Sequence, residues 1–315
     1  MPEPAAVDLV VYGTDAAPGL LECVDLAEAA GLGGIWVGDS PVLWRELYVL
    51  LGAAAERTGR IRLGPAVTNP VSRHVAVTAS ALLTLQELAG GRAALGLGLG
   101  ASAVRTVGAK PAKLAELERT VEELRAYWAG GEDGLGYGGE QPPVPLLLGA
   151  SGPRMLELSG RIGEGCLAVV GLNPRQLEAA RARLAAGGAD AGFEVVWWVP
   201  IAAAVDSAQA REDVKSYVAR SLRHPLPAEL TEVERDAAER IRASYEYGQH
   251  LAPGAAHAEL VPDEIVADWA VAGTPAECRE QLRRLDLRAG ERIGLVPMGR
   301  EPKAVQVRRL LEEVL

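Results

Sequence analysis

Short apolar runs alternate with amphipathic stretches along most of the chain. Eight runs have the length and nearly continuous apolar character of buried β-strands: Val7–Tyr12, Gly34–Val37, Ile61–Val67, Arg92–Leu97, Val144–Leu148, Cys166–Val170, Phe193–Val205 and Arg292–Val296. Such runs are typical of parallel strands that are covered on both faces. The stretches between them carry apolar residues at helical spacing. The pattern therefore predicts parallel strands joined by helices.

The number of these units and the chain length together favour one architecture. Strict alternation of strand and helix implies right-handed crossovers, and eight units in 315 residues fit a closed (β/α)8 TIM barrel better than an open sheet. No linker-like stretch divides the chain, so we expect one α/β domain over residues 1–315. Residues 207–260 are mostly helical and more charged, which predicts a helical insertion between strands 7 and 8 of the barrel.

Composition and charge exclude several classes of function. The net charge of −10 repels phosphate backbones, so we expect no nucleic-acid partner. No apolar run approaches the roughly 18 residues of a membrane helix, and the first residues show no secretory signal. Cys23, Cys166 and Cys278 lie far apart without a CxxC pair, which favours reduced thiols in a cytoplasmic protein without a membrane partner.

Candidate chemistry follows the strands directly. In a (β/α)8 barrel the active site lies at the carboxyl ends of the strands. Polar or glycine-rich segments come after the second, third, fourth and fifth runs: Asp39, Ser40 and Trp44, then Thr68–Pro70, Gly98–Ser102 and Gly149–Arg154. Because these segments would meet at one end of the barrel, we expect them to form a binding site for a small molecule.

The segment after the fifth run has the features of an anion site. Gly152 is followed by Pro153, which is favoured at the first position of a helix. Free backbone N–H groups and the helix dipole at such a position attract a phosphate, and Arg154 adds a charge. A tight turn with a solvated arginine is the alternative. The other glycine-rich strand ends favour the phosphate.

Other motifs carry weaker signals. Gly98-x-Gly100-x-x-Ala103 fits a loose dinucleotide pattern, but no second strand with a terminal acid follows, so we do not expect NAD. These glycines more plausibly let a flat ring approach the backbone. The four histidines show no HxH or HExxH spacing, so no metal site is expected. Tyr245, Tyr247 and His250 either line a substrate pocket or pack helices, and helix packing is favoured.

Several motifs in order resemble one known family. They are Gly64-Pro65-Ala66-Val67-Thr68-Asn69-Pro70, Thr78-Ala79-Ser80-Ala81, Leu85-Gln86-Glu87-Leu88-x-x-Gly91-Arg92, Gly149-Ala150-Ser151-Gly152-Pro153 and Val271-x-Gly273-Thr274-Pro275. Together they resemble the luciferase-like monooxygenase superfamily. The resemblance is strongest to the branch that uses the deazaflavin coenzyme F420, typified by methylenetetrahydromethanopterin reductase, and it covers nearly the whole chain.

The resemblance implies a barrel, often a homodimer or higher homo-oligomer, that holds F420 or FMN at the strand ends. It places the following residues at the cofactor: Asp39, Ala66, Val67, Asn69, Gly98, Gly100, Ala150, Ser151, Gly152 and Arg154. The bond between Ala66 and Val67 matches a non-prolyl cis peptide of the family. Tyr12, Ser40 and Trp44 are the implied residues on the catalytic side.

Two departures from the family pattern bear on catalysis. Ser40 stands where some relatives have a proton-donating histidine, and Ala101 stands where an acid is common. Tyr12 replaces an acid at the end of the first run. We therefore expect an F420-dependent reductase that transfers a hydride between the cofactor and a C=N or C=C bond of a small organic substrate. The alternatives are an FMN-dependent luciferase-like monooxygenase and a cofactor-binding protein without turnover.

Overall fold

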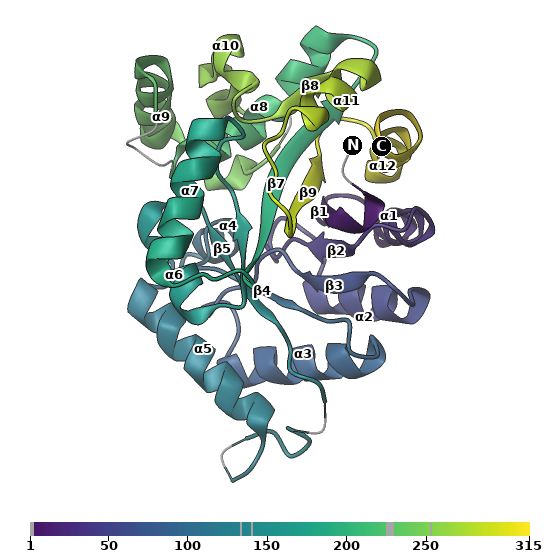
Figure 1. Cartoon of the computed structure of the whole chain (residues 1–315), viewed down its shortest axis with the longest axis vertical. Helices are drawn as coiled ribbons and strands as arrows, with labels where there is room; N and C mark the ends of the chain where they lie inside the picture. The colour runs from purple at the N-terminus through teal and green to yellow at the C-terminus, as the bar shows by residue number, and fades with distance from the viewer. Residues whose placement is uncertain (1–2, 133, 140, 225–229, 253) are drawn as a thin grey trace.

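Eight parallel strands close into a barrel in the computed structural model, which describes residues 3–132, 134–139, 141–224, 230–252 and 254–315 (Figure 1). The strands follow the order β3-β2-β1-β9-β7-β6-β5-β4, and parallel bridges between Leu63 and Ala93 and between Thr68 and Leu97 join the two ends. Their bounds are β1 Val7–Val11, β2 Gly34–Val37, β3 Arg62–Pro65, β4 Leu95–Leu97, β5 Leu146–Ala150, β6 Gly165–Ala168, β7 Glu194–Ala203 and β9 Glu291–Pro297. The predicted (β/α)8 barrel is confirmed.

A ninth strand, which the apolar pattern does not predict, lies outside this closed order. Strand β8, Val271–Gly273, pairs in parallel with the last residues of β7, from Ile201 to Ala203. Strand β7 is long enough to pair with β6 at its start, β9 over most of its length and β8 at its end. A strand of three residues is too short to show a pattern of apolar and polar positions in the sequence. Strand β8 is therefore recognised only by its pairing with β7.

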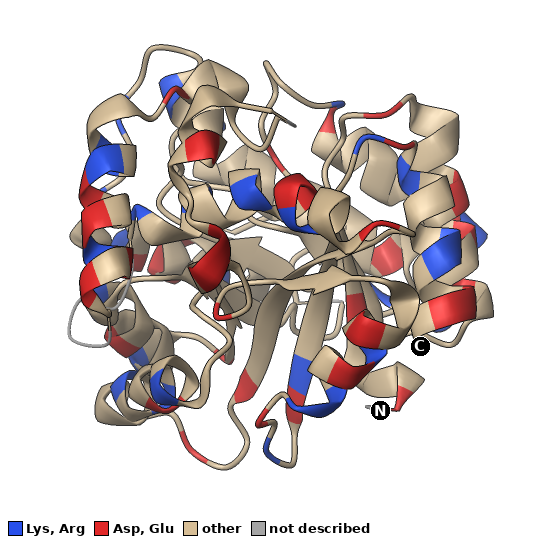
Figure 2. Cartoon of the chain, turned by 90° about the horizontal axis from the view of Figure 1, so that it is seen from above, with Lys and Arg blue, Asp and Glu red and all other residues tan. Residues whose placement is uncertain are grey.

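Helices cover the outer face of the barrel and one of its ends (Figure 1). They are α1 Ala17–Ala29, α2 Leu47–Arg57, α3 Val75–Leu88, α4 Ser102–Arg105, α5 Leu114–Ala129, α6 Pro153–Ile162, α7 Pro174–Gly187, α8 Ser207–Leu222, α9 Glu232–Ser244, α10 Asp263–Val266, α11 Pro275–Arg283 and α12 Lys303–Arg309. Lys and Arg are interspersed with Asp and Glu on these helices (Figure 2). The two chain ends lie near one another, where α1 packs against α12.

Residues 207–260, predicted as a helical insertion, are mostly helical where the structure describes them. Helices α8 and α9 are followed by two 3-10 turns, Tyr247–Gln249 and Ala256–Leu260. Residues 225–229 and 253 of this segment lie outside the described residues. Apolar side chains of α8 and α9, such as Tyr217 and Ile241, belong to the same buried cluster as Val10 and Trp198 of the strands. The insertion therefore packs over one end of the barrel.

Alternation along the strands separates this cluster from a second one. Val7, Leu9 and Val11 of β1 pack with Leu20 and Cys23 of the outer helix α1. Val10 belongs instead to the cluster that contains Trp36 and Trp198. Successive residues of a strand point to opposite faces of the sheet, so β1 contributes to the helix-covered face and to the barrel interior.

Charged residues close the opposite end of the barrel, where the strands begin. Asp8 is fully buried and accepts hydrogen bonds from Trp36 Nε1 at 2.8 Å and from the Arg292 guanidinium. Arg62 lies 3.5 Å from Asp8 and donates two 2.6 Å hydrogen bonds to Glu194. We call these five residues the barrel floor. Each charge in it has a partner of opposite sign, which is the condition for tolerating buried charge.

Candidate active site

Asp39 is held at the carboxyl end of β2 by residues of the next βα loop. Its Oδ2 accepts hydrogen bonds from Thr68 Oγ1 at 2.7 Å and from Arg73 Nη1 at 2.6 Å, and its side chain is 1% exposed. Arg73 also donates to Glu46 at 2.9 Å. No donor of the described residues reaches the other carboxylate oxygen, Oδ1. Asp39 is thus a fixed carboxylate with one oxygen left for a ligand.

Arg73 was missed by the sequence reasoning. It lies 34 residues beyond Asp39, in a loop whose polar residues carry no recognisable spacing. Its guanidinium also lies 5.1 Å from the centre of the Tyr48 ring. The pairing of Asp39 with a cation becomes visible only when β2 and β3 lie side by side.

Tyr12, Ser40 and Trp44 come together at the ends of β1 and β2. The rings of Tyr12 and Trp44 lie 4.7 Å apart, and Trp44 N donates to the Ser40 carbonyl at 2.8 Å. The Ser40 hydroxyl oxygen is buried and has no hydrogen-bond partner among the described residues. Burial, and then the neighbouring Tyr217, raise the pKa of Tyr12 well above its usual value. The Tyr12 phenol therefore remains protonated at neutral pH.

The strand end after β3 carries the expected cis peptide, between Ala66 and Val67. The Val67 side chain fills the space beside two glycines of neighbouring strands. A Cβ atom at Gly98 would lie 2.7 Å from a Val67 methyl group, and one at Gly149 would lie 2.8 Å from another. A side chain at either glycine would collide with Val67. The spacing of the glycines in the sequence does not reveal this packing.

Asn69 shapes the loop that follows. Its Oδ1 accepts hydrogen bonds from the backbone N–H groups of Val71 and Ser72, each at 2.9 Å, and its Nδ2 donates to Ser72 Oγ at 3.0 Å. The side chain of Asn69 is almost fully buried. Gly100, on the adjacent strand end, has a φ of +81°, and a Cβ there would lie 3.2 Å from Asn69 Cβ.

Helix α6 begins as the sequence predicts, with Gly152 as the N-cap and Pro153 in the first turn. No side chain caps this end. A Cβ at Gly152 would meet no atom within 4 Å, and Arg154 is exposed. Ala150 is the last residue of β5 and Ser151 follows it. An uncapped helix start with open space before it is suited to bind an anion.

Residues of the insertion pack against Trp44, and we call Tyr245, Tyr247 and His250 the aromatic cap. The His250 ring lies 6.0 Å from that of Trp44, and its Nδ1 shares a 2.6 Å hydrogen bond with the Tyr245 hydroxyl. The rings of Tyr245 and Tyr247 lie 5.3 Å apart. Burial, and then the cations Arg220 and Arg223, lower the pKa of His250 well below its usual value. His250 is therefore neutral at neutral pH.

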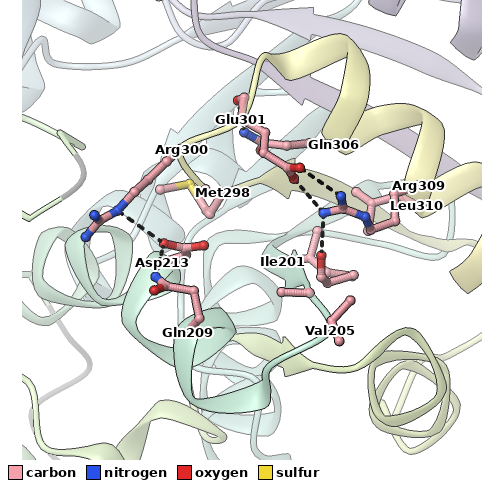
Figure 3. Close-up of a pocket in the computed structure, with 13 residues that line it drawn as sticks. Ile201, Val205, Gln209, Asp213, Met298, Arg300, Glu301, Gln306, Arg309 and Leu310 are labelled. Atoms are coloured by element: carbon pink, nitrogen blue, oxygen red, sulfur yellow. Dashed lines mark hydrogen bonds and ion pairs between the residues drawn. The ribbon is translucent and has the colours of Figure 1, made fainter.

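A separate pocket of about 280 Å³ opens at the ends of β7 and β9, between α8 and α12 (Figure 3). None of the predicted site residues lines it. Its charged groups are paired: Arg309 bonds Glu301 at 2.6 and 2.9 Å, and Arg300 lies 3.9 Å from Asp213. We therefore place the candidate site at the strand ends of β1 to β5, where polar groups remain unpaired.

Metal ligands, membrane-spanning helices and reactive thiols are the remaining features of the described part of the chain that bear on function. No group of three or more His, Cys, Asp and Glu side chains there is arranged to hold a metal ion. No helix there is both long and apolar enough to span a membrane. The thiols of Cys23, Cys166 and Cys278 are free and buried, and burial raises the pKa of each to about 12.

A fold of this kind, with its site at the strand ends, matches one family over most of the chain. The profile of the luciferase-like monooxygenase family matches residues 5–290, and the chain belongs to this family.

Within the family, relatives of known activity can be compared. The chain is 31% identical to a 5,10-methylenetetrahydromethanopterin reductase of Archaeoglobus fulgidus over 83% of its own length and 84% of the relative's. It is 34% identical to an F420-dependent glucose-6-phosphate dehydrogenase of Beutenbergia cavernae over 48% of its length and 52% of that protein's. The solved structure of the coenzyme F420-dependent tetrahydromethanopterin reductase from Methanopyrus kandleri superposes with a TM-score of 0.74 at 23% identity, covering 98% of both chains. The resemblance to the F420 branch is confirmed.

Proposed function

We propose that this protein is an F420-dependent oxidoreductase, with a small organic molecule as its substrate. The observation that carries the proposal is the uncapped start of α6 at the same barrel end as the anchored Asp39, in a barrel with a reductase of this branch as a relative over most of its length. Transfer of a hydride to a C=N or C=C bond, or from the C–H of the corresponding single bond in the reverse direction, is the reaction that this combination supports.

The residues at the strand ends fit such a cofactor. The start of α6 offers backbone N–H groups to a phosphate, and Gly152 leaves open space in front of them. The buried Ser40 hydroxyl lacks a partner that a bound ligand can supply. Asp39, Asn69, Gly100 and Ser151 would hold the cofactor, with Arg154 at its charged end. When bound, the deazaflavin supplies the hydride chemistry.

The protein itself orients the cofactor and substrate, excludes water from the site and provides a hydroxyl that carries a proton. The aromatic cap on Trp44 covers the site and limits the access of water, which strengthens electrostatic interactions there. The Tyr12 phenol stays protonated, so its O–H can donate to a developing anion on the substrate. Tyr12, with Trp44 and Ser40 beside it, is therefore the proposed catalytic side of the site.

The first prediction concerns which cofactor the protein binds. Purified protein should bind F420 more tightly than FMN, because the segments Thr68–Pro70 and Gly149–Arg154 match the deazaflavin branch. Fluorescence titration of each cofactor measures both affinities. Tight binding of FMN without binding of F420 would favour the monooxygenase alternative. Binding of F420 without hydride transfer to any substrate in a screen with the reduced cofactor would favour a binding protein without turnover.

The Tyr12→Phe variant should slow turnover about tenfold to a hundredfold while leaving the affinity for F420 nearly unchanged, since it removes one hydrogen-bond donor to the developing anion. In both enzymes the rate of hydride transfer should be nearly flat between about pH 6 and 8. Burial lowers the pKa of His250 well below its usual value and so keeps this ring neutral over the range, and burial lowers the pKa of His257 in the same direction.

Stopped-flow measurement of cofactor oxidation across this pH range tests both parts. Tyr137→Phe is the control, because it removes a tyrosine hydroxyl that shares a 2.7 Å hydrogen bond with Ser80 Oγ and lies outside the site. A Tyr12→Phe enzyme at full speed, or a sharp titration near pH 6.5, would assign the proton chemistry to another residue.

A further inference from the structure

Three arginines lie near the aromatic cap, and among the described residues no carboxylate pairs with them. Arg223, directly after α8, is only 6% exposed. Its Nη1 donates to the Tyr247 hydroxyl at 2.5 Å, and its Nε is buried without an acceptor among the described residues. Arg220, one helical turn earlier, and Arg105, at the end of α4, are the other two.

Aromatic rings of the cap bring two of these guanidinium groups together, while Arg220 lies 5.3 Å from the centre of the Tyr217 ring. Arg223 lies 3.9 Å from the centre of the Tyr245 ring and 4.8 Å from that of Tyr247. Arg105 lies 4.9 Å from the centre of the same Tyr247 ring. Two cations from different parts of the chain thus share one ring. Stacking fixes the direction of a guanidinium and leaves its donors free for a planar acceptor such as a carboxylate or phosphate.

The positive charges of these three arginines are not balanced by acidic side chains of the described residues. Within the described ranges, no Asp or Glu oxygen lies within 4 Å of a nitrogen of Arg105, Arg220 or Arg223. Burial lowers the pKa of Arg223, and repulsion from Arg220 lowers it further, against the favourable effect of the two tyrosines. The arginines of the pocket in Figure 3, by contrast, are paired with acids. A buried charge without a partner is stabilised by an anion.

The position of this cluster relates it to the substrate side of the site. The aromatic cap connects it to Trp44 and, through Trp44, to Tyr12. Helix α4, which carries Arg105, follows the glycine-rich end of β4 and contacts the turn that begins at Tyr247. The cluster therefore lies over the same end of the barrel as the predicted catalytic residues, on elements other than α6.

We propose that Arg105, Arg220 and Arg223 bind a carboxylate or phosphate group of the substrate, so that the enzyme acts on an anionic molecule. That the bound anion is a substrate rests on the proposed function. That an anion binds here rests on the arginine cluster itself. Arg223 contributes a fork of donors close to the Tyr245 and Tyr247 rings, and Arg105 adds a second guanidinium 4.9 Å from the centre of the Tyr247 ring.

The test uses the protein without cofactor, with inorganic phosphate and succinate as probes in isothermal titration calorimetry. Arg223→Met keeps the length of the side chain and removes its charge, and it should weaken binding of at least one probe tenfold or more. Arg240→Met is the matched control, since Arg240 is exposed on α9 and paired with Asp236, and it should bind like the wild type. Arg105→Gln changes an exposed residue and should weaken binding severalfold even if Arg223→Met does not fold.

Titration with F420, and with its deazaflavin chromophore lacking the phosphate-bearing tail, separates the two possible sources of the anion. Unchanged affinity of Arg223→Met for both supports a substrate subsite. Weaker binding of F420 with unchanged binding of the tail-free chromophore would assign the arginines to the cofactor phosphate and overturn the proposal. Equal probe binding by all variants would overturn it as well. A wild type that binds the probes but not F420 would refute the proposed function alone.

Discussion

Replacing Asp8 with alanine should lower the free energy of unfolding by about 3–5 kcal/mol, the usual effect of removing one partner from a buried ion pair. Asp8 is fully buried in the barrel floor and contacts two arginines and Trp36. Without it, Arg62 and Arg292 share Glu194 alone, and the Trp36 N–H loses its acceptor. The large loss of stability comes from the buried arginine charges that remain without Asp8, rather than from the loss of one contact.

Urea unfolding followed by tryptophan fluorescence measures this change. Glu22→Ala is the control, because Glu22 pairs with Arg308 on the surface with both side chains 49% exposed. An exposed pair contributes at most about 1 kcal/mol, so this variant should unfold close to the wild type. An Asp8→Ala protein as stable as Glu22→Ala would show that the barrel floor does not stabilise the fold.

The second large effect concerns the cofactor. Gly152→Asp should weaken binding of F420 by about tenfold to a hundredfold, because it places a carboxylate at the helix start proposed to hold the phosphate, at a cost of about 1–3 kcal/mol. The open space at Gly152 allows the new side chain to fit without displacing its neighbours. The effect should shrink as salt is added, since ions screen exposed charges.

Gly152→Asn separates charge from shape in this experiment, because asparagine has nearly the same size as aspartate and carries no charge. It should bind F420 within a few-fold of the wild type when measured by the same fluorescence titration. If the aspartate and asparagine variants bind F420 equally well, the phosphate of the cofactor lies elsewhere.

Features that depend on neighbouring residues in the chain were predictable from the sequence. The apolar runs predicted the eight barrel strands, because a strand covered on both faces must be apolar along its length. Gly152 and Pro153 predicted the start of α6, because proline fits the first turn of a helix and glycine the position before it. The same local segments carried the family resemblance that the comparison with known proteins confirmed.

Features that depend on residues far apart in the chain were decided only by the tertiary structure. Asp8 is one polar residue in an apolar run, and its partners Trp36 and Arg292 lie 28 and 284 residues away. Arg73 reaches Asp39 across two strand ends, and Arg223 and Arg105 meet on one tyrosine ring. Hydrophobic periodicity records which face of an element is buried, and it contains no information about which charges face each other. Local sequence therefore predicts the barrel, the family and the start of α6, while closure of the barrel sets how the charged and aromatic groups around the strand ends are paired.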